Sequence, residues 1–321
     1  MSHDLGPPPL PLPTTASASA AMPSVTVAIT APGGGVPRVA LLLLAVLTLL
    51  WGTNWALFPL AVHEVSVWTF RGVSSLGAGL ALLAVARLRG LPMTIPRRYW
   101  PTVAAATFCY LVVWNVASTY AAVLIPSGQA AVLGFTMPLW AALIGWAVLG
   151  QPLGARMLFA LAFGAAAVGL LAWRGMDAYA QAPLGVALAL TAAVGWAAGT
   201  VILKRGAVAV PALVLTGWQL LATSVPIGTV ALVLGEGGWF WPSWASIGVI
   251  AYITLVPMAI GNFCWFTIVG MLPAPVAGLS SIMVPVVAML AGALVHAEPL
   301  GAVQLLAMAS CGVALWLALR R

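Results

Sequence analysis

The chain has 321 residues, of which 63% are hydrophobic and only 5% are charged, and its formal net charge is +7. A soluble domain carries roughly a quarter charged residues, so this composition excludes a soluble globular fold and predicts a protein embedded in a lipid bilayer. The positive charge does not indicate nucleic-acid binding, because the basic residues lie at the ends of apolar segments.

Residues 1–37 differ in composition from the rest of the chain. Prolines crowd the start of this segment and a mixture of Ser, Thr and Ala follows, so it can bury little apolar surface. We predict a disordered cytoplasmic tail here. The apolar run from Val39 to Val62 is too long for the apolar part of a signal peptide, and it indicates a first transmembrane helix.

Apolar segments recur along the remaining chain, each close to the ~20 residues that span a bilayer as a helix. Ten helices are expected, near residues 39–62, 66–86, 101–123, 127–149, 156–173, 184–203, 212–234, 244–268, 274–295 and 300–319. The predicted fold class is therefore an all-α polytopic membrane protein. The connections are short, so consecutive helices should run antiparallel.

The basic residues are distributed very unevenly between the two sides of this arrangement. Arg174 alone falls on one side, and Arg71 lies within the second helix. The opposite side carries Arg38, Arg87, Arg89, Arg97, Arg98, Arg156, Lys204, Arg205, Arg320 and Arg321. Cytoplasmic loops are enriched in Lys and Arg, so both termini are expected in the cytoplasm.

An internal repeat with a constant offset of 147 residues relates the two halves of the chain, as from Pro138 to Pro285. The segment ending Gly150-Gln151-Pro152-Leu153-Gly154 matches one ending Ala297-Glu298-Pro299-Leu300-Gly301. The same offset joins Pro126 to Pro273, Asn115 to Asn262, and Gly52-Thr53 to Gly199-Thr200. Residues 38–173 and 184–321 then form two five-helix repeats. Because five is odd, the second repeat should be inverted, as in many carriers.

At these residues the chain resembles the ten-helix EamA-type branch of the drug/metabolite transporter superfamily. The resemblance covers residues 39–319 and rests on Trp51-Gly52-Thr53-Asn54, on Phe70-Arg71-Gly72 and on the paired proline motifs. It implies export of small metabolites, often amino acids, across a bacterial inner (plasma) membrane. Exporters of aromatic amino acids are one subgroup, to which these motifs do not assign the chain. Gln151 departs from the Glu that similar proteins often carry there.

Polar and aromatic residues in the middle of the membrane are the candidate substrate contacts, because polar groups are costly there. Asn115 and Asn262 occupy equivalent positions, and their amides can serve either a polar substrate or hydrogen bonds between helices. The aromatic candidates are Trp51, Trp55, Trp114, Trp196 and Trp265, which could line a cavity or fill space between helices. Asn54 and Thr200, beside the matched glycines, complete this set.

Arg71 is the single basic residue expected inside a transmembrane helix, roughly 7–8 Å from its outer end. It could bind a substrate carboxylate. Two structural alternatives are that its side chain extends outward to water, or that it pairs with Glu64 near the same end.

Helix-loosening residues suggest hinges for a conformational cycle. Pro138 and Pro285 are expected in the middle of helices four and nine, and Pro257 in helix eight, where each removes a backbone hydrogen bond. A static kink is the alternative. Gly52 and Gly199 permit either bending or close packing, and packing is favoured.

Acidic and histidine residues fall in the tail or loops and not at mid-membrane. We therefore expect a facilitative alternating-access carrier of amino acids, with large apolar or aromatic ones favoured. Export of lipophilic or cationic drugs, or proton-coupled antiport, are the alternatives. The sequence shows no nucleophile–base pair, no metal-ligand pattern and no pore motif. We therefore expect neither an enzyme nor a channel, and no cofactor or metal site. The expected partners are a small molecule and the bilayer, with the chain monomeric or a loose homodimer.

Overall fold

A computed structural model of the chain describes residues 37–125, 127–150, 152–174, 176–234, 241–272, 281–296 and 301–319. The tail expected in residues 1–37 therefore lies outside the described residues except for Pro37, as do Pro126, Pro273, Gln151 and the segment 297–300 of the paired motifs. All regular elements in the described ranges are helices.

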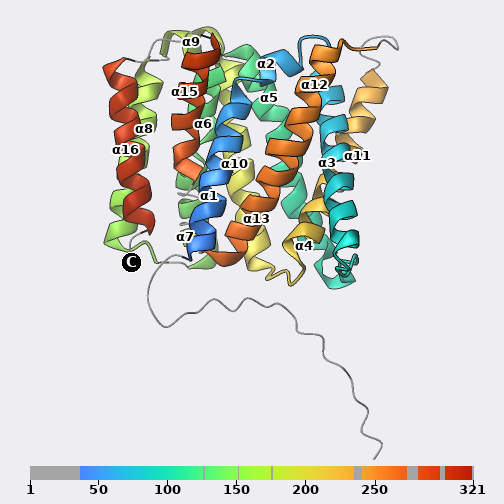
Figure 1. The fold of residues 1–321 in the computed structure, drawn as a ribbon. Coiled ribbons are helices and arrows are strands. Elements are labelled where there is room, and N and C mark those ends of the chain that lie inside the picture. The colour runs from blue at the N-terminus through green and yellow to red at the C-terminus, as the bar shows by residue number, and fades with distance from the viewer. Residues whose placement is uncertain are drawn as a thin grey trace, which may run out of the picture. The chain divides into compact units, whose positions relative to one another are not determined.

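The helices of the first half follow the expected order closely (Figure 1). They are α1 (Arg38–Trp55), α2 (Phe58–Ala61), α3 (Val67–Leu88), α4 (Trp100–Thr107), α5 (Trp114–Leu124), α6 (Ser127–Gly134), α7 (Met137–Leu149) and α8 (Ala155–Arg174). Those of the second half are α9 (Met176–Gln181), α10 (Pro183–Arg205), α11 (Ala212–Leu234), α12 (Trp244–Ile253), α13 (Asn262–Met271), α15 (Val284–His296) and α16 (Ala302–Leu319). Two 3-10 turns, Arg97–Tyr99 and Ser281–Met283, precede α4 and α15.

The lengths and apolar surfaces of these helices fit a membrane protein. Within the described residues, 7 helical segments are long and apolar enough to span a bilayer, and shorter apolar helices cover Ala155–Leu170 and Leu305–Ala314. Large apolar side chains such as Leu232 and Trp173, 83% and 80% exposed, face outward where lipid can solvate them. The all-helical polytopic prediction is confirmed, whereas the count of ten helices and the cytoplasmic termini stay predictions.

Helix packing repeats itself between the two halves. The equivalent helices α3 and α11 pack against each other, and so do α8 and α16. Helix α1 packs on α13 and α15 in the same way as its equivalent α10 packs on α5 and α7. A pseudo-twofold axis between the two repeats would produce this reciprocal pattern.

The helical segment from α4 to α5 and the one from α12 to α13 share a backbone irregularity that no sequence pattern predicted. Each contains a π-helical segment, η2 (Phe108–Val113) between α4 and α5 and η3 (Thr254–Gly261) between α12 and α13. The offset of 147 residues superimposes the two segments to within about one residue. Short π segments inside α-helices are frequent at functional sites.

The proline positions in the fourth and ninth spans differ from the expectation. Pro138 and Pro285 do not interrupt continuous helices, because each lies in the first turn of its helix, α7 or α15. A turn at Phe135–Thr136 separates α6 from α7. Proline is favoured at the start of a helix, where its missing N–H costs nothing, so these prolines mark helix starts. Pro257 does lie within a helical segment, the π segment η3.

The matched glycines Gly52 and Gly199 let helices approach closely. A Cβ atom on Gly52 would lie 3.2 Å from the carbonyl oxygen of Val284, and one on Gly199 would lie 2.8 Å from that of Ala106. This geometry supports close packing of α1 on α15 and of α10 on α4. A hinge role for either glycine stays a prediction.

Candidate functional site

A cavity lies beside the two π segments and is lined by residues of both repeats. Its lining combines Trp51, Asn54, Trp55, Phe58, Arg71, Leu111, Trp114, Asn115, Phe135, Trp196, Pro257, Met258 and Asn262. The cavity has a volume of about 40 Å³, which is room for a few water molecules. The cavity thus gathers residues from both repeats around one small space.

Most of the predicted substrate contacts meet at this cavity. Asn54, Arg71, Asn115, Asn262 and four of the five candidate tryptophans line it, as does the hinge candidate Pro257. Trp265 and Thr200 do not line it, and neither do the remaining hinge candidates, Pro138, Pro285, Gly52 and Gly199. Thr200 instead donates to the carbonyl oxygen of Trp196 in its own helix, at 2.9 Å.

The side chains of the two asparagines form hydrogen bonds to the backbone of their own helices. Asn115 donates its amide N–H to the carbonyl oxygen of Leu111 at 2.8 Å, and Asn262 donates to that of Met258 at 2.7 Å. Both side chains are buried, with 3% and 6% of their surface exposed. Neither bond joins two helices, so these two contacts do not support the alternative in which the asparagines form hydrogen bonds between helices. They fix both amides, and the Oδ1 of Asn262 is left without a hydrogen-bond partner.

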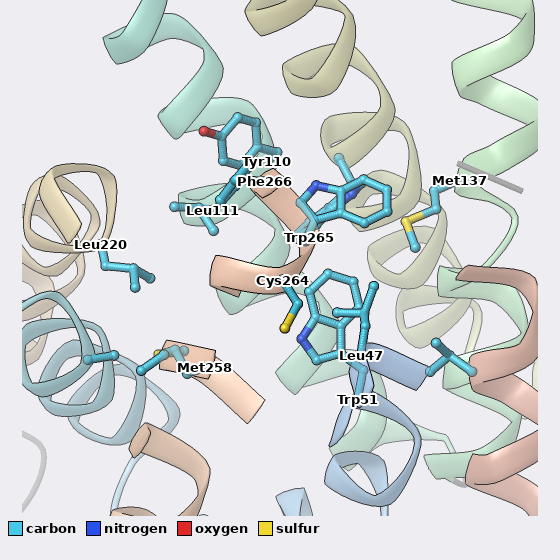
Figure 2. Packing of buried hydrophobic residues seen from close by; sticks show 14 of the residues in the cluster. Leu47, Trp51, Tyr110, Leu111, Met137, Leu220, Met258, Cys264, Trp265 and Phe266 are labelled. Atoms are coloured by element: carbon cyan, nitrogen blue, oxygen red, sulfur yellow. The ribbon is translucent and has the colours of Figure 1, made fainter. Parts of the chain in front are cut away.

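Tryptophans packed edge to face form much of the cavity wall. The ring centroids of Trp51 and Trp196 lie 5.3 Å apart at an interplanar angle of 88°, and those of Trp114 and Trp196 lie 5.0 Å apart. Trp265 backs this wall, with its centroid 5.7 Å from that of Trp51 and 5.5 Å from that of Trp196 (Figure 2). Edge-to-face packing of this kind makes a rigid, apolar surface.

The indole of Trp51 is held in place by the irregular segment η3. Its Nε1 donates to the carbonyl oxygen of Pro257 at 3.1 Å. A Cβ on Gly261 would lie only 2.5 Å from this same nitrogen, so a side chain there would displace the ring. The first repeat has Trp114 at the position that matches Gly261, so the two repeats differ here and the cavity wall is asymmetric.

Arg71 is buried on the cavity wall and has no acidic partner within the described residues. Only 2% of its surface is exposed, and its Nε donates to Thr119 Oγ1 at 2.6 Å. The guanidinium lies over the rings of Phe58 and Phe70, with its carbon 4.3 and 4.8 Å from their centroids. Its Nη2 has no hydrogen-bond partner.

Both structural alternatives for Arg71 are therefore wrong. The side chain does not extend to water, because it is buried. It does not pair with Glu64, whose carboxylate accepts hydrogen bonds from Ser243 at 2.7 Å (backbone N) and 2.6 Å (Oγ). The cation is held by a hydroxyl group and two aromatic rings and keeps an unused donor.

Two oxygens at the cavity complement this unused donor. Asn54 Oδ1 and Asn262 Oδ1 are buried and accept no hydrogen bond. A buried polar atom without a partner is uncommon in proteins and calls for water or a ligand. The site therefore offers one cationic donor and two neutral acceptors to an occupant.

Four cavity residues escaped the sequence analysis: Phe58, Leu111, Phe135 and Met258. Leu111 and Met258 had a usable signal, because they are matched by the repeat offset and precede the two asparagines by one helical turn. Phe58 and Phe135 lie next to helix breaks that the sequence pattern does not reveal.

A model of the EamA-like transporter family matches residues 38–173 and again residues 183–320. The "uncharacterized transporter YvbV" of Bacillus subtilis (strain 168) is 28% identical, over 81% of this chain and 84% of that protein. The "probable amino-acid metabolite efflux pump" of Escherichia coli (strain K12) is 25% identical, over 80% and 86%. The "uncharacterized inner membrane transporter YedA" of Escherichia coli (strain K12) is 27% identical, over 82% and 84%.

A crystal structure of another protein has the same fold, with a TM-score of 0.72 at 21% identity over 87% of this chain and 96% of that chain. The apolar helices make the chain a multi-pass membrane protein, and the name of its relative YedA describes an inner membrane transporter. Since the family model accounts for both halves of the chain, the protein belongs to the EamA-like transporter family, within the drug/metabolite transporter superfamily.

Proposed function

We propose that the protein is an alternating-access carrier that exports amino acids, with a preference for large apolar or aromatic side chains. The observation that carries this proposal is Arg71, a buried guanidinium on the cavity wall that has an unused donor and no acidic partner in the described chain. A charge buried without its counter-ion is costly, and an anionic ligand removes that cost.

The unused atoms match the head group of an amino acid. The carboxylate accepts from Arg71 Nη2, and the ammonium donates to the free oxygens of Asn54 and Asn262. The indoles of Trp51, Trp114 and Trp196 then face the amino-acid side chain. An apolar or aromatic side chain packs well on such rings, whereas a charged one would lose its hydration. A lipophilic cation suits the rings but not Arg71.

The small size of the cavity supports a transport cycle in which helices move to admit the substrate. An amino acid is larger than the few water molecules that about 40 Å³ can hold. The starts of α7 and α15 at Pro138 and Pro285, and the π segment containing Pro257, interrupt the regular α-helix. We assign the hinges to these places. Ten spans in two inverted repeats with cytoplasmic termini would let the repeats rock about the cavity.

Facilitative transport is the coupling mode we favour, because the cavity lining contains no Asp, Glu or His. A proton-coupled carrier needs a group that titrates as it changes its exposure, and arginine stays protonated throughout. The direction of transport follows the E. coli relative, whose name describes an efflux pump.

The test is transport of a panel of labelled amino acids by the purified protein in proteoliposomes, with and without a pH gradient. Saturable flux without the gradient is expected. Arg71→Gln should abolish flux of the amino acid, with Arg87→Gln as control, because Arg87 is an exposed residue near the end of the same helix. Equal flux in the two variants would contradict carboxylate binding at Arg71. Flux only under a pH gradient would make the protein a proton-coupled antiporter.

A further inference from the structure

A second group of buried polar side chains lies one aromatic ring away from the cavity. The ring of Tyr110, in η2, packs against Trp196 of the cavity wall, with centroids 5.8 Å apart. The hydroxyl of Tyr110 lies next to the side chains of Thr107 in α4 and Gln219 in α11. Figure 2 shows this hydroxyl turned away from the indoles of Trp51 and Trp265. We call Thr107, Tyr110 and Gln219 the polar trio.

The polar trio is buried yet unsatisfied. The exposed fractions of Thr107, Tyr110 and Gln219 are 3%, 1% and 0%. Although the three side chains are neighbours, neither hydroxyl nor either polar atom of the Gln219 amide completes a hydrogen bond of good geometry. By contrast, Thr216 and Thr223 in the same helix each donate to a backbone carbonyl at 2.7 Å. The three side chains pair only loosely with one another, so their buried hydrogen-bonding capacity calls for water or a ligand.

The repeat relation places the polar trio opposite the Arg71 site. The strict equivalent of Arg71 is Trp218, which donates to the carbonyl oxygen of Met93, and Gln219 follows it directly. The equivalent of Thr107 is Thr254, whose hydroxyl donates to Ser74 of α3 at 3.0 Å. A hydrogen bond therefore joins α3 to η3. The equivalent region, where α11 meets α4 and η2, contains the polar trio, whose side chains form no hydrogen bond of good geometry.

The two sites lie on opposite sides of the tryptophan wall along the third span. Arg71 is bonded to Thr119 in α5, whereas Thr107 belongs to α4. Figure 1 shows α4 and α5 toward opposite ends of the bundle, with the start of α1 toward the α4 end. Trp196, which contacts both Tyr110 and the cavity, separates the two sites.

We propose that the polar trio is a second binding station, which holds the carboxylate of the substrate on the α4 side of the tryptophan wall when Trp196 moves aside. This inference rests on the proposed amino-acid carrier. Two hydroxyl groups and an amide N–H are suitable carboxylate donors, and being neutral they hold the anion less tightly than Arg71 does. Affinity would then rise along the path from the end where α1 begins toward Arg71.

Thiol labelling tests whether the pathway reaches the polar trio, and it does not depend on the identity of the substrate. Gln219→Cys is made in a variant in which Cys109, Cys264 and Cys311 are replaced by Ser. The matched control is Leu220→Cys, at the next position and also 0% exposed. A charged methanethiosulfonate should modify the cysteine at position 219 faster by about tenfold or more, because only a hydrated thiol ionises readily. Equally slow labelling of both would overturn the inference.

Flux through Gln219→Leu then distinguishes a station from a water pocket. We expect the maximal rate to fall about tenfold, the effect of one lost hydrogen bond on the path, while equilibrium affinity at the Arg71 site stays unchanged. Thr223→Val is the control, because its hydroxyl is satisfied within the helix. Unchanged flux with raised thermal stability would show a purely structural trio. If the wild type carries no amino acid, the proposed substrate is wrong and the carboxylate station falls with it, whereas fast labelling at position 219 would still show a hydrated path to the polar trio.

Discussion

Asn115 and Asn262 make the same hydrogen bond in the two repeats, each to the carbonyl oxygen of the residue one helical turn earlier, at 2.8 and 2.7 Å. Each follows a π segment, where the regular backbone ladder is interrupted. Each amide therefore satisfies a carbonyl within its own helix, and in Asn262 the Oδ1 remains without a hydrogen-bond partner at the cavity.

Asn262→Leu should weaken substrate binding without unfolding the protein. Leucine has a similar volume, but it removes the free acceptor that we assign to the substrate ammonium. The KM of the transported amino acid is expected to rise about tenfold, as for the loss of one charge-assisted hydrogen bond. The control is Thr267→Val in the same helix, whose hydroxyl donates only to the carbonyl oxygen of Phe263. An equal KM for the two variants would argue against Asn262 as a contact.

Gly261→Ala should disturb the cavity wall. The added Cβ would lie 2.5 Å from Trp51 Nε1, so the indole must leave the carbonyl oxygen of Pro257. Overpacking of this kind costs about 1–3 kcal/mol and should lower both the melting temperature and the flux. Gly270→Ala is the control, since no atom lies within 4 Å of a Cβ built there. Loss of stability in the control alone would contradict the assigned role of Gly261.

Thr119 positions the guanidinium of Arg71. It accepts from Arg71 Nε at 2.6 Å and donates to the carbonyl oxygen of Asn115 at 2.7 Å. Thr119→Val leaves a buried cationic donor unpaired, which costs about 1–3 kcal/mol, and should lower both the melting temperature and substrate affinity. Thr119→Ser should restore both, because it keeps the hydroxyl. Failure of serine to rescue affinity would indicate that packing, not the hydrogen bond, matters here.

Glu64 should make stability depend on pH through its link between the two repeats. Hydrogen bonds from the side chain and backbone of Ser243, at the start of α12, lower the pKa of Glu64 below its usual value of 4.5. A lowered pKa means that the link stabilises the fold fully above pH 4.5 and is lost as the pH falls below it.

The check is the melting temperature of the wild type and Glu64→Gln as a function of pH. The wild type should be the more stable of the two at neutral pH. The difference should shrink as the pH falls below 4.5. A difference independent of pH would show that the ionised carboxylate contributes nothing.

Sequence periodicity predicted the helical class and the repeat because these depend on long, averaged patterns. The offset that joins Pro138 to Pro285 also joins the bounds of α7 to those of α15. Local backbone geometry could not be predicted in this way. Phe108–Val113 is as apolar as any regular helix, so nothing in it signals a π turn. Pro138 indicated a perturbed helix but not that the helix begins there.

The candidate site was only partly predictable for a similar reason. Arg71, Asn115 and Asn262 stand out in a membrane segment because polar groups are rare there. Trp265 stands out equally, yet it packs behind the cavity wall and not on it. Depth along a helix can be counted in the sequence, but the side of the helix that faces a cavity depends on how neighbouring helices pack.

The unlike residues at matched positions, Arg71 against Trp218 and Trp114 against Gly261, have a thermodynamic consequence. Two identical inverted repeats would give inward-open and outward-open forms that mirror one another and have equal energies. Because the repeats are not interchangeable, the two forms of the proposed alternating-access cycle would differ in free energy, and the empty carrier would favour one of them. In the proposed facilitative mode, half-saturating substrate concentrations measured from the two faces should then differ without any coupled energy source.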